Sequence, residues 1–401
     1  MIKPRFIFWL LALFIGFLFN NLVQHKIMLI LMLLLLIMPI FSLLYSFYTK
    51  RKISVEISTQ QDYIVRGENA LWDFEIINHS LIQAIFIQVK IKFPKIINQD
   101  RQLKSEILIP QKSSQTLRIV ADSAYSGPFN FSNLAIYAND IFGFFRIKLF
   151  SEKDLDSPNI IVLPKEEQAT DYKQYLSNQL EAGEFPAGKS HVLLDEISRF
   201  RSMEAGDSLK LIHWKLSARM QEWMVKEFDK EDDRTVTVLL NLPEVNLASD
   251  KDQSKLLRKR NFMLDHSYTA MQIFLSNRAT VRLKTYQPEL VVEEVSTMNE
   301  IDLLQKQLAF IPFERIIDFQ EQLADERFDN EQNLIYLLTY KLNDSLIADL
   351  RNIRPHIGAM LLVYVIDEDV DETLIQSQIE KLSTNGINVE IAKTHEANVY
   401  E

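Results

Sequence analysis

The sequence predicts a multidomain protein with two N-terminal transmembrane helices, an all-β immunoglobulin-like sandwich and a C-terminal α/β Rossmann-like domain. Three observations lead to this fold class. Two long apolar runs open the chain, short strand-like segments separated by turn residues follow, and beyond residue 230 apolar strands alternate with amphipathic helices. The expected boundaries are 1–50 for the helix pair, 51–155 for the sandwich, 156–230 for a linking motif segment and 231–401 for the α/β domain.

The first two elements are the apolar runs Phe6 to Val23 and Ile27 to Tyr48, which contain no Asp, Glu, Lys or Arg. Roughly 20 apolar residues suffice to cross the hydrocarbon core of a bilayer, so each run predicts a membrane-spanning helix. A cleaved signal peptide is the alternative for the first run. It is disfavoured because no small-residue cleavage site follows and a second span begins almost at once.

Positive charge predicts the orientation of this helical hairpin. Lys3 and Arg5 precede the first run and Lys50-Arg51-Lys52 follow the second, whereas the short link carries only His25 and Lys26. By the positive-inside rule both outer ends lie in the cytoplasm. The expected localisation is therefore the cell membrane, multi-pass, with the soluble domains cytoplasmic.

The region after residue 52 reads as antiparallel β-structure. Alternating apolar residues mark the strands, and turn signals such as Ser126-Gly127-Pro128 separate them. Short strands at such spacing predict a sandwich. The expected strands are Ile53 to Ile57, Leu71 to Ile77, Ala84 to Phe93, Thr116 to Ala121, Phe129 to Tyr137 and Phe142 to Phe150.

Beyond Glu231 the pattern changes to alternating strands and helices, which predicts a parallel sheet with helices on both faces. The expected strands are Thr235 to Asn241, Ala279 to Tyr286, Asn333 to Tyr340, Met360 to Ile366 and Ile387 to Ala392. The expected helices are Ser254 to Leu275, Ile301 to Leu308, Leu346 to Ile353 and Glu372 to Leu382.

The segment between the two soluble domains has the most distinctive pattern. An Arg-rich strand leads through a Gly-Asp turn to a Trp-Lys-x-x-Ala-Arg helix and then to a strand with an acidic-aromatic pair. This pattern resembles the bacterial membrane-protein family known as domain of unknown function 58, and Asp140-Ile141-Phe142-Gly143-Phe144-Phe145 resembles the end of that family's β-domain. The motif residues are Arg199, Arg201, Gly206, Asp207, His213, Trp214, Lys215, Ala218, Arg219 and Glu227.

The resemblance implies a von Willebrand A-like C-terminal domain and a MoxR-type AAA+ ATPase as a partner, with a transglutaminase-like membrane protein as a further companion. Domains of the von Willebrand A type often bind a divalent cation through Asp-x-Ser-x-Ser after the first strand. Here Asn241 replaces the expected Asp, while Pro243 and Val245 replace the hydroxyls, so we expect the metal site to be lost.

Three interpretations of the motif remain open. In a structural network, the arginines pair with acids such as Asp207 and Trp214 is buried in the core. In a docking surface, Lys215 and Arg219, four residues apart on one helix face, meet an acidic partner. In a catalytic site, Asp207 and His213 act together, although His213 has no evident nucleophile or ligand set beside it.

Composition limits the function classes. The net charge of −10 argues against nucleic-acid binding, and the absence of cysteine excludes disulfides and thiolate chemistry. No Walker loop or other catalytic motif is present, so no cofactor is expected. The leading hypothesis is a non-enzymatic membrane adaptor that acts with the ATPase in assembling or maturing cell-envelope proteins. The alternatives are a hydrolase using Asp207 and His213, and a purely structural scaffold.

Overall fold

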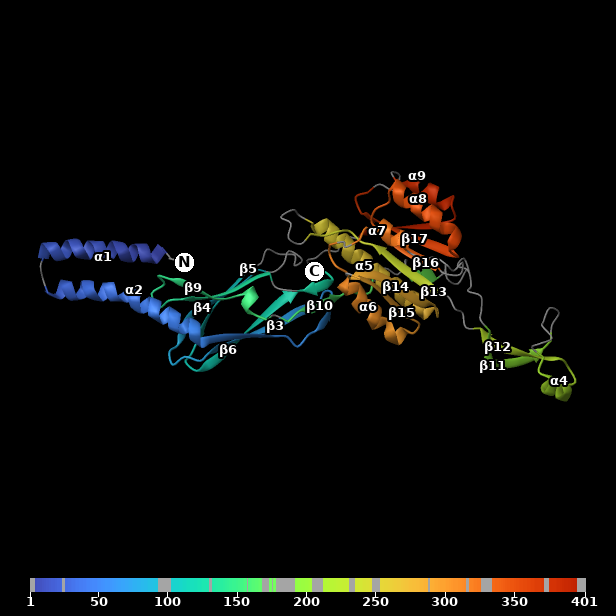
Figure 1. Cartoon of the computed structure of the whole chain (residues 1–401), viewed down its shortest axis with the longest axis horizontal. Helices are drawn as coiled ribbons and strands as arrows, with labels where there is room; N and C mark the ends of the chain where they lie inside the picture. Colours follow the sequence, from blue (N-terminus) through green and yellow to red (C-terminus); the bar gives the residue numbers. More distant parts are fainter. Residues whose placement is uncertain are drawn as a thin grey trace. The chain divides into compact units, whose positions relative to one another are not determined.

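The structure is a computed structural model, which describes residues 4–23, 26–92, 102–129, 132–156, 158–167, 173–174, 176–177, 192–203, 212–230, 235–246, 253–287, 289–314, 317–325, 334–370 and 375–394. The chain forms two compact units, residues 1–163 and residues 164–401, whose elements are labelled in Figure 1. Each unit is described by itself.

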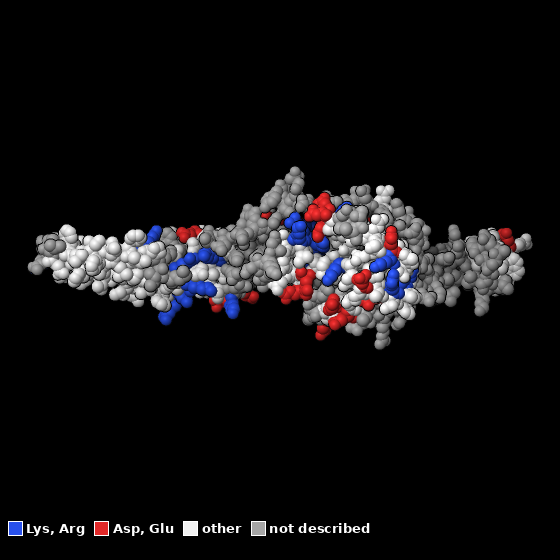
Figure 2. All heavy atoms as spheres, turned by 90° about the horizontal axis from the view of Figure 1, so that it is seen from above, with Lys and Arg blue, Asp and Glu red and all other residues white. Residues whose placement is uncertain are grey.

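Two apolar helices open the first unit. α1 spans Pro4–Val23 and α2 spans Lys26–Lys52, and both are long and apolar enough to cross a membrane. The indole N–H of Trp9 on α1 donates to the carbonyl oxygen of Leu35 on α2 at 3.0 Å. Three consecutive basic residues end α2, and Figure 2 shows basic side chains gathered on the same part of this unit.

Two antiparallel sheets make up most of the remaining first unit. One has the strand order β1-β3-β6 and the other β5-β4-β8-β9, while β2, β10 and β7 form a small third sheet. The bounds are β1 Ile53–Ser58, β2 Tyr63–Val65, β3 Asn69–Asn78, β4 Ala84–Lys92, β5 Gln102–Ile109, β6 Ser113–Asp122, β7 Gly127–Phe129, β8 Ser132–Asn139, β9 Arg146–Ser151 and β10 Ile160–Leu163, with a 3₁₀ turn at Glu152–Asp154.

One apolar core lies between the two larger sheets. Alternate residues of β3, including Trp72 and Phe74, are fully buried and belong to the same cluster as Ile87 and Val89 of β4. Trp72 also stacks on Phe129, with ring centroids 5.0 Å apart. The period of two along β3 therefore directs its apolar side chains towards the facing sheet.

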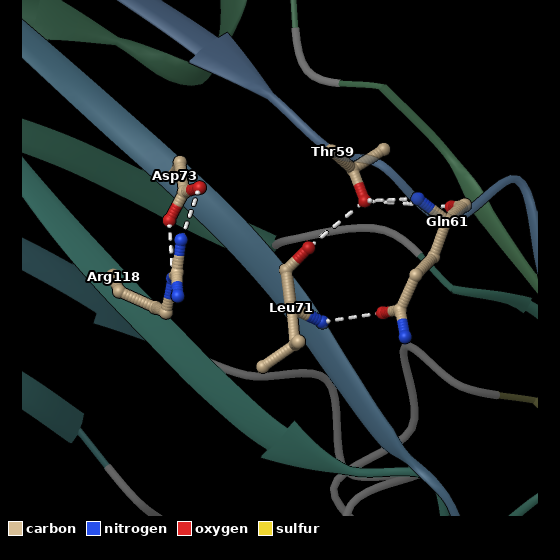
Figure 3. Close-up of polar contacts among 5 residues, drawn as sticks. All are labelled: Thr59, Gln61, Leu71, Asp73 and Arg118. Atoms are coloured by element: carbon tan, nitrogen blue, oxygen red, sulfur yellow. Dashed lines mark hydrogen bonds and ion pairs between the residues drawn. The ribbon is translucent and has the colours of Figure 1, made fainter.

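The opposite face of β3 carries a polar pair (Figure 3). The guanidinium of Arg118 on β6 donates through Nε and Nη2 to the two carboxylate oxygens of Asp73 at 2.8 and 2.9 Å. This cross-strand hydrogen bonding lowers the pKa of the Asp73 carboxyl. Nearby, Thr59 Oγ1 donates to the carbonyl of Leu71 at 2.9 Å and Gln61 accepts from the Leu71 amide at 3.0 Å, which ties the segment after β1 to β3.

Two predicted strands of this unit differ from the observed ones. The strand expected over Phe142 to Phe150 begins only at Arg146, because the preceding residues form a loop that packs against α1. The strand expected over Phe129 to Tyr137 is divided between β7 and β8, which belong to different sheets. β5 completes the second sheet and was not expected.

The second unit contains a six-stranded sheet of order β15-β14-β13-β16-β17-β18. Every adjacent pair is parallel except β14 and β15, which are antiparallel. The strand bounds are β13 Thr235–Asn241, β14 Thr280–Gln287, β15 Glu289–Val295, β16 Leu334–Thr339, β17 Ala359–Asp367 and β18 Asn388–Thr394.

Helices cover both faces of this sheet (Figure 1). The side chains of Val238 and Tyr336 pack in one core cluster with α5 and α6, whereas the neighbouring Leu239 and Leu337 pack in another with α7, α8 and α9. Buried strands apolar on both faces are typical of parallel sheets. The bounds are α5 Ser254–Ser276, α6 Ile301–Phe310, α7 Phe319–Asp325, α8 Asp344–Ile353 and α9 Gln376–Ser383, with 3₁₀ turns at Met298–Glu300 and Arg354–His356.

Candidate functional site

The motif segment forms a β-hairpin with a short helix between its strands (Figure 1). β11, Val192–Ser202, pairs antiparallel with β12, Met224–Lys230, and α4, Trp214–Met220, connects them. The strand register places Arg199 opposite Glu227. Arg199 and Arg201 both lie in β11, in agreement with the Arg-rich strand expected from the sequence.

α4 is fixed by polar contacts at both ends. His213 is the N-cap, and its Nδ1 accepts from the backbone N–H of Leu216 at 3.1 Å. Gln221 ends the helix in a left-handed conformation. Asp207, a motif residue of the Gly-Asp turn expected before this helix, lies outside the described residues.

Ser217 attaches α4 to β12, and sequence reasoning did not single it out. Its hydroxyl donates to the carbonyl of His213 at 3.1 Å and accepts from the backbone N–H of Met224 at 2.8 Å. The side chain is buried. A serine four residues after a helix cap is a recognisable signal for such a backbone contact, since Ser hydroxyls commonly bond to the carbonyl one turn earlier.

The outer surface of this segment is aromatic. Trp214 and Trp223 are 63% and 54% exposed, and their rings meet edge to face at 5.5 Å. Met220 and Phe200 are also exposed. We call these four residues the aromatic surface. The interpretation that buried Trp214 in a core is wrong, because nearly two thirds of this residue contacts solvent.

The polar motif residues fall into two groups. Lys215, Ala218 and Arg219 are exposed on α4, as the docking interpretation requires. Gly206 and Asp207 lie outside the described residues, and only the backbone is described for Arg199, Arg201 and Glu227. A network of these arginines with acids therefore stays a prediction.

Comparison with protein families identifies the segment. The model of the family described as "Protein of unknown function DUF58" matches residues 199–284, which contain the end of β11, all of α4, β12, β13 and α5, and the first residues of β14. This match supports a protein of the DUF58 family. No curated protein matches it.

Solved structures resemble the DUF58 chain only in part. The CARDB domain of the PF1109 protein from Pyrococcus furiosus, in complex with di-metal ions, aligns at 13% identity with a TM-score of 0.20, covering 28% of this chain and 87% of that one. Spo0M, a sporulation control protein from Bacillus subtilis, aligns at 12% identity with a TM-score of 0.17, covering 38% and 58%. These scores carry no functional argument.

The loop Asp140–Phe145 of this DUF58 chain, which we call the anchor loop, contacts both apolar helices. Phe144 packs against Phe6 and Trp9 of α1, with centroid distances of 6.1 and 6.0 Å. Gly143 has a φ of +73°, and a Cβ there would lie 2.8 Å from Arg5 Nη1. The left-handed conformation therefore favours glycine, whereas the flexible Arg5 side chain could move away from a Cβ.

Asp140 joins the anchor loop to α2. The hydroxyl of Ser42, on α2, donates to Asp140 Oδ2, and the backbone N–H of Phe145 donates to Asp140 Oδ1 at 2.9 Å. Both Ser42 and Asp140 are almost fully buried. Tyr45 adds a second connection by donating to the carbonyl of Gln83 at 2.7 Å. The family-like motif at 140–145 thus attaches the β-sheets to the helix pair.

At the end of β13, where von Willebrand A-type domains often bind a metal ion, the structure places the uncharged side chains of Asn241 and Thr339. Asn241 ends β13 and donates through Nδ2 to Thr339 Oγ1 at 2.9 Å, while Glu244 is exposed. Among the described residues, no group of three or more metal-ligating side chains occurs. The loss of metal binding stays a prediction.

Proposed function

We propose that this DUF58 protein is a non-enzymatic, membrane-anchored adaptor that binds a protein partner through the aromatic surface. The observation that carries this proposal is the exposure of Trp214 and Trp223 side by side. Two large aromatic rings in water are costly, whereas Trp is enriched among the residues that dominate protein–protein binding energy. The exposed Lys215 and Arg219 on the same helix favour a partner with an acidic surface.

The family resemblance supports the identity of the partner. We propose a MoxR-type AAA+ ATPase, with which the protein assists assembly or maturation of cell-envelope proteins; a transglutaminase-like membrane protein is a further candidate. We also propose that the six-stranded α/β sheet belongs to a von Willebrand A-like domain. The β-sheets of the first unit would then form an immunoglobulin-like domain.

Co-purification tests this adaptor function. The full chain in detergent should retain the ATPase, and Lys215→Glu should weaken binding roughly tenfold, because it places a negative charge against an acidic partner. Lys255→Glu, at an exposed lysine of α5, is the matched control and should bind like the wild type. Equal binding by all three proteins would remove the electrostatic part of the proposal.

A hydrolase centred on His213 has less support. The Nδ1 atom of His213 is used for capping, and the ring packs edge to face against Phe200 at 4.9 Å. The cavity formed by described residues near the end of β13 does not include His213. Asp207 lies outside the described residues, so no observation favours the catalytic interpretation.

We propose that both apolar helices span the membrane and that the β-sheets of the first unit and the whole second unit lie in the cytoplasm. Because the chain has no cysteine, single-cysteine labelling can test this directly. Ser377→Cys, at an exposed position of α9, should react with a membrane-impermeant maleimide only after cell lysis. Asn21→Cys, near the end of α1, should react in intact cells. The reverse pattern would contradict the orientation and the cytoplasmic ATPase with it.

A further inference from the structure

A small cavity lies at the carboxyl ends of β13 and β14, where open α/β sheets commonly bind ligands. Its volume is about 60 Å³. The last residues of β13 and the segment after it form one side, and β14 contributes Lys284 through Tyr286. Arg260 of α5, the segment Ile311 to Glu314 and Gln322 of α7 complete the lining. The cavity has room for a group of a few atoms.

Arg260 is the unusual residue of this lining. Only 3% of it is exposed, and its Nη2 donates to the carbonyl of Ile311 at 2.7 Å. The guanidinium lies 5.0 Å from the ring centroid of Phe313, within cation–π range. Its Nε–H, however, is buried and has no hydrogen-bond acceptor among the described residues. The hydrogen-bonding capacity of this cation is therefore incompletely satisfied.

Among the described residues, no negative charge compensates Arg260. Burial lowers the pKa of its guanidinium to about 10, and no described carboxylate raises that pKa again. The group nevertheless stays protonated at neutral pH. A buried cation without a counter-ion is destabilising, so its presence beside a cavity indicates a site that an anion completes.

The charges around Arg260 restrict the kind of anion. Lys284 is half-buried in the lining and adds a second positive charge, whereas Glu244 and Glu314 are exposed. The inner part is thus cationic and the outer part carries two carboxylates. A divalent phosphate would be repelled more strongly by those glutamates than a monovalent carboxylate. The planar guanidinium matches the geometry of a carboxylate as well as that of a phosphate, so the two glutamates decide between them.

We propose that the Arg260 cavity binds a single carboxylate group, supplied by a small organic acid or by an acidic side chain of a polypeptide. The guanidinium and Lys284 provide its counter-charge. The apolar lining around Leu242 and Phe313 keeps water from screening the interaction. This site is independent of the aromatic surface and does not rest on the adaptor proposal.

Isothermal titration calorimetry on the full chain in detergent tests the proposal with acetate, glutarate, inorganic phosphate and a capped Gly-Glu-Gly peptide as probes. We expect the carboxylates to bind more tightly than phosphate. Tighter binding of the peptide than of glutarate assigns the carboxylate to a polypeptide, and the reverse assigns it to a small acid. Stronger binding of phosphate, or no binding by any carboxylate, would overturn the proposal.

Arg260→Met should weaken carboxylate binding at least tenfold, because it keeps the side-chain volume and removes the charge. Its thermal midpoint should not fall below that of the wild type, since an uncompensated buried charge is removed. Arg258→Met, at an exposed arginine on the same helix, should bind like the wild type. Unchanged binding by a folded Arg260→Met protein would overturn the proposal.

A second variant keeps the test decisive if Arg260→Met does not fold. Glu244→Gln removes one of the two exposed negative charges next to the cavity, so carboxylate binding should become several-fold tighter. Unchanged or weaker binding by this variant would count against the site.

Discussion

Trp214→Ala is expected to lower the affinity of the protein for its partner by about 30-fold or more, which corresponds to about 2 kcal/mol for the loss of a central aromatic contact. The stability of the chain should change little, because Trp214 is 63% exposed and loses mainly its edge contact with Trp223. Biolayer interferometry with the full chain in detergent and the purified MoxR-type ATPase measures the affinity.

Leu290→Ala is the matched control for this experiment. Leu290 is a large apolar residue, 49% exposed on β15, and its truncation should leave binding unchanged. If a folded Trp214→Ala protein bound the ATPase within threefold of the wild type, the aromatic surface would not be the docking site. If the variant instead lost affinity for lipid vesicles, the surface would contact a membrane rather than a protein.

The regular elements of the second unit were the most predictable from sequence. Buried parallel strands such as β13 and β16 are short continuous apolar runs, and the 3.6-residue period of α5 distinguishes it from them. β15 was missed because it lies at the sheet edge, where the apolar Leu290 and Val292 are exposed and Glu293 lies on the less exposed face, so apolar and polar residues do not alternate along it. β15 is a strand because it pairs with β14, and not because of the pattern of its own residues.

The sequence predicted where the candidate site lies along the chain, but not which of its side chains are exposed. The motif located the hairpin and the exposed positions of Lys215 and Arg219, because helical spacing alone puts them on one face. Sequence could not assign the exposure of Trp214, since an aromatic residue in a short helix is usually buried. Here Ser217 makes the contact with β12, and that choice depends on the tertiary arrangement of α4.

The conformation of the anchor loop could not be predicted from the sequence either. Phe142 to Phe150 has the apolar content of a strand, yet residues up to Phe145 pack against α1 instead of continuing β9. The aromatic side chains find partners on α1 that are more than 100 positions away in sequence, and such a contact has no local signature. The sequence indicates only the left-handed backbone at Gly143, where φ is +73°, because glycine adopts that conformation readily.

Asp140→Ala is expected to lower the free energy of unfolding of the first unit by about 3 kcal/mol, because it leaves the buried hydroxyl of Ser42 and the partly buried N–H of Phe145 without their acceptor. Thermal unfolding of the full chain in nanodiscs measures this loss. Hydrogen exchange should rise locally in the anchor loop and in the last turns of α2.

Asp154→Ala is a closely matched control for Asp140→Ala. Asp154 also accepts from a backbone N–H and a serine hydroxyl, both of Ser151, and these hydrogen bonds lower the pKa of its carboxyl, but it is exposed. Its removal should therefore have a much smaller effect, since water replaces the lost acceptor. In a double-mutant cycle, Ser42→Ala should cost little once Asp140 is absent. Equal destabilisation by the two aspartate variants, or additive effects in the cycle, would show that the buried contact does not hold the sheets to the helix pair.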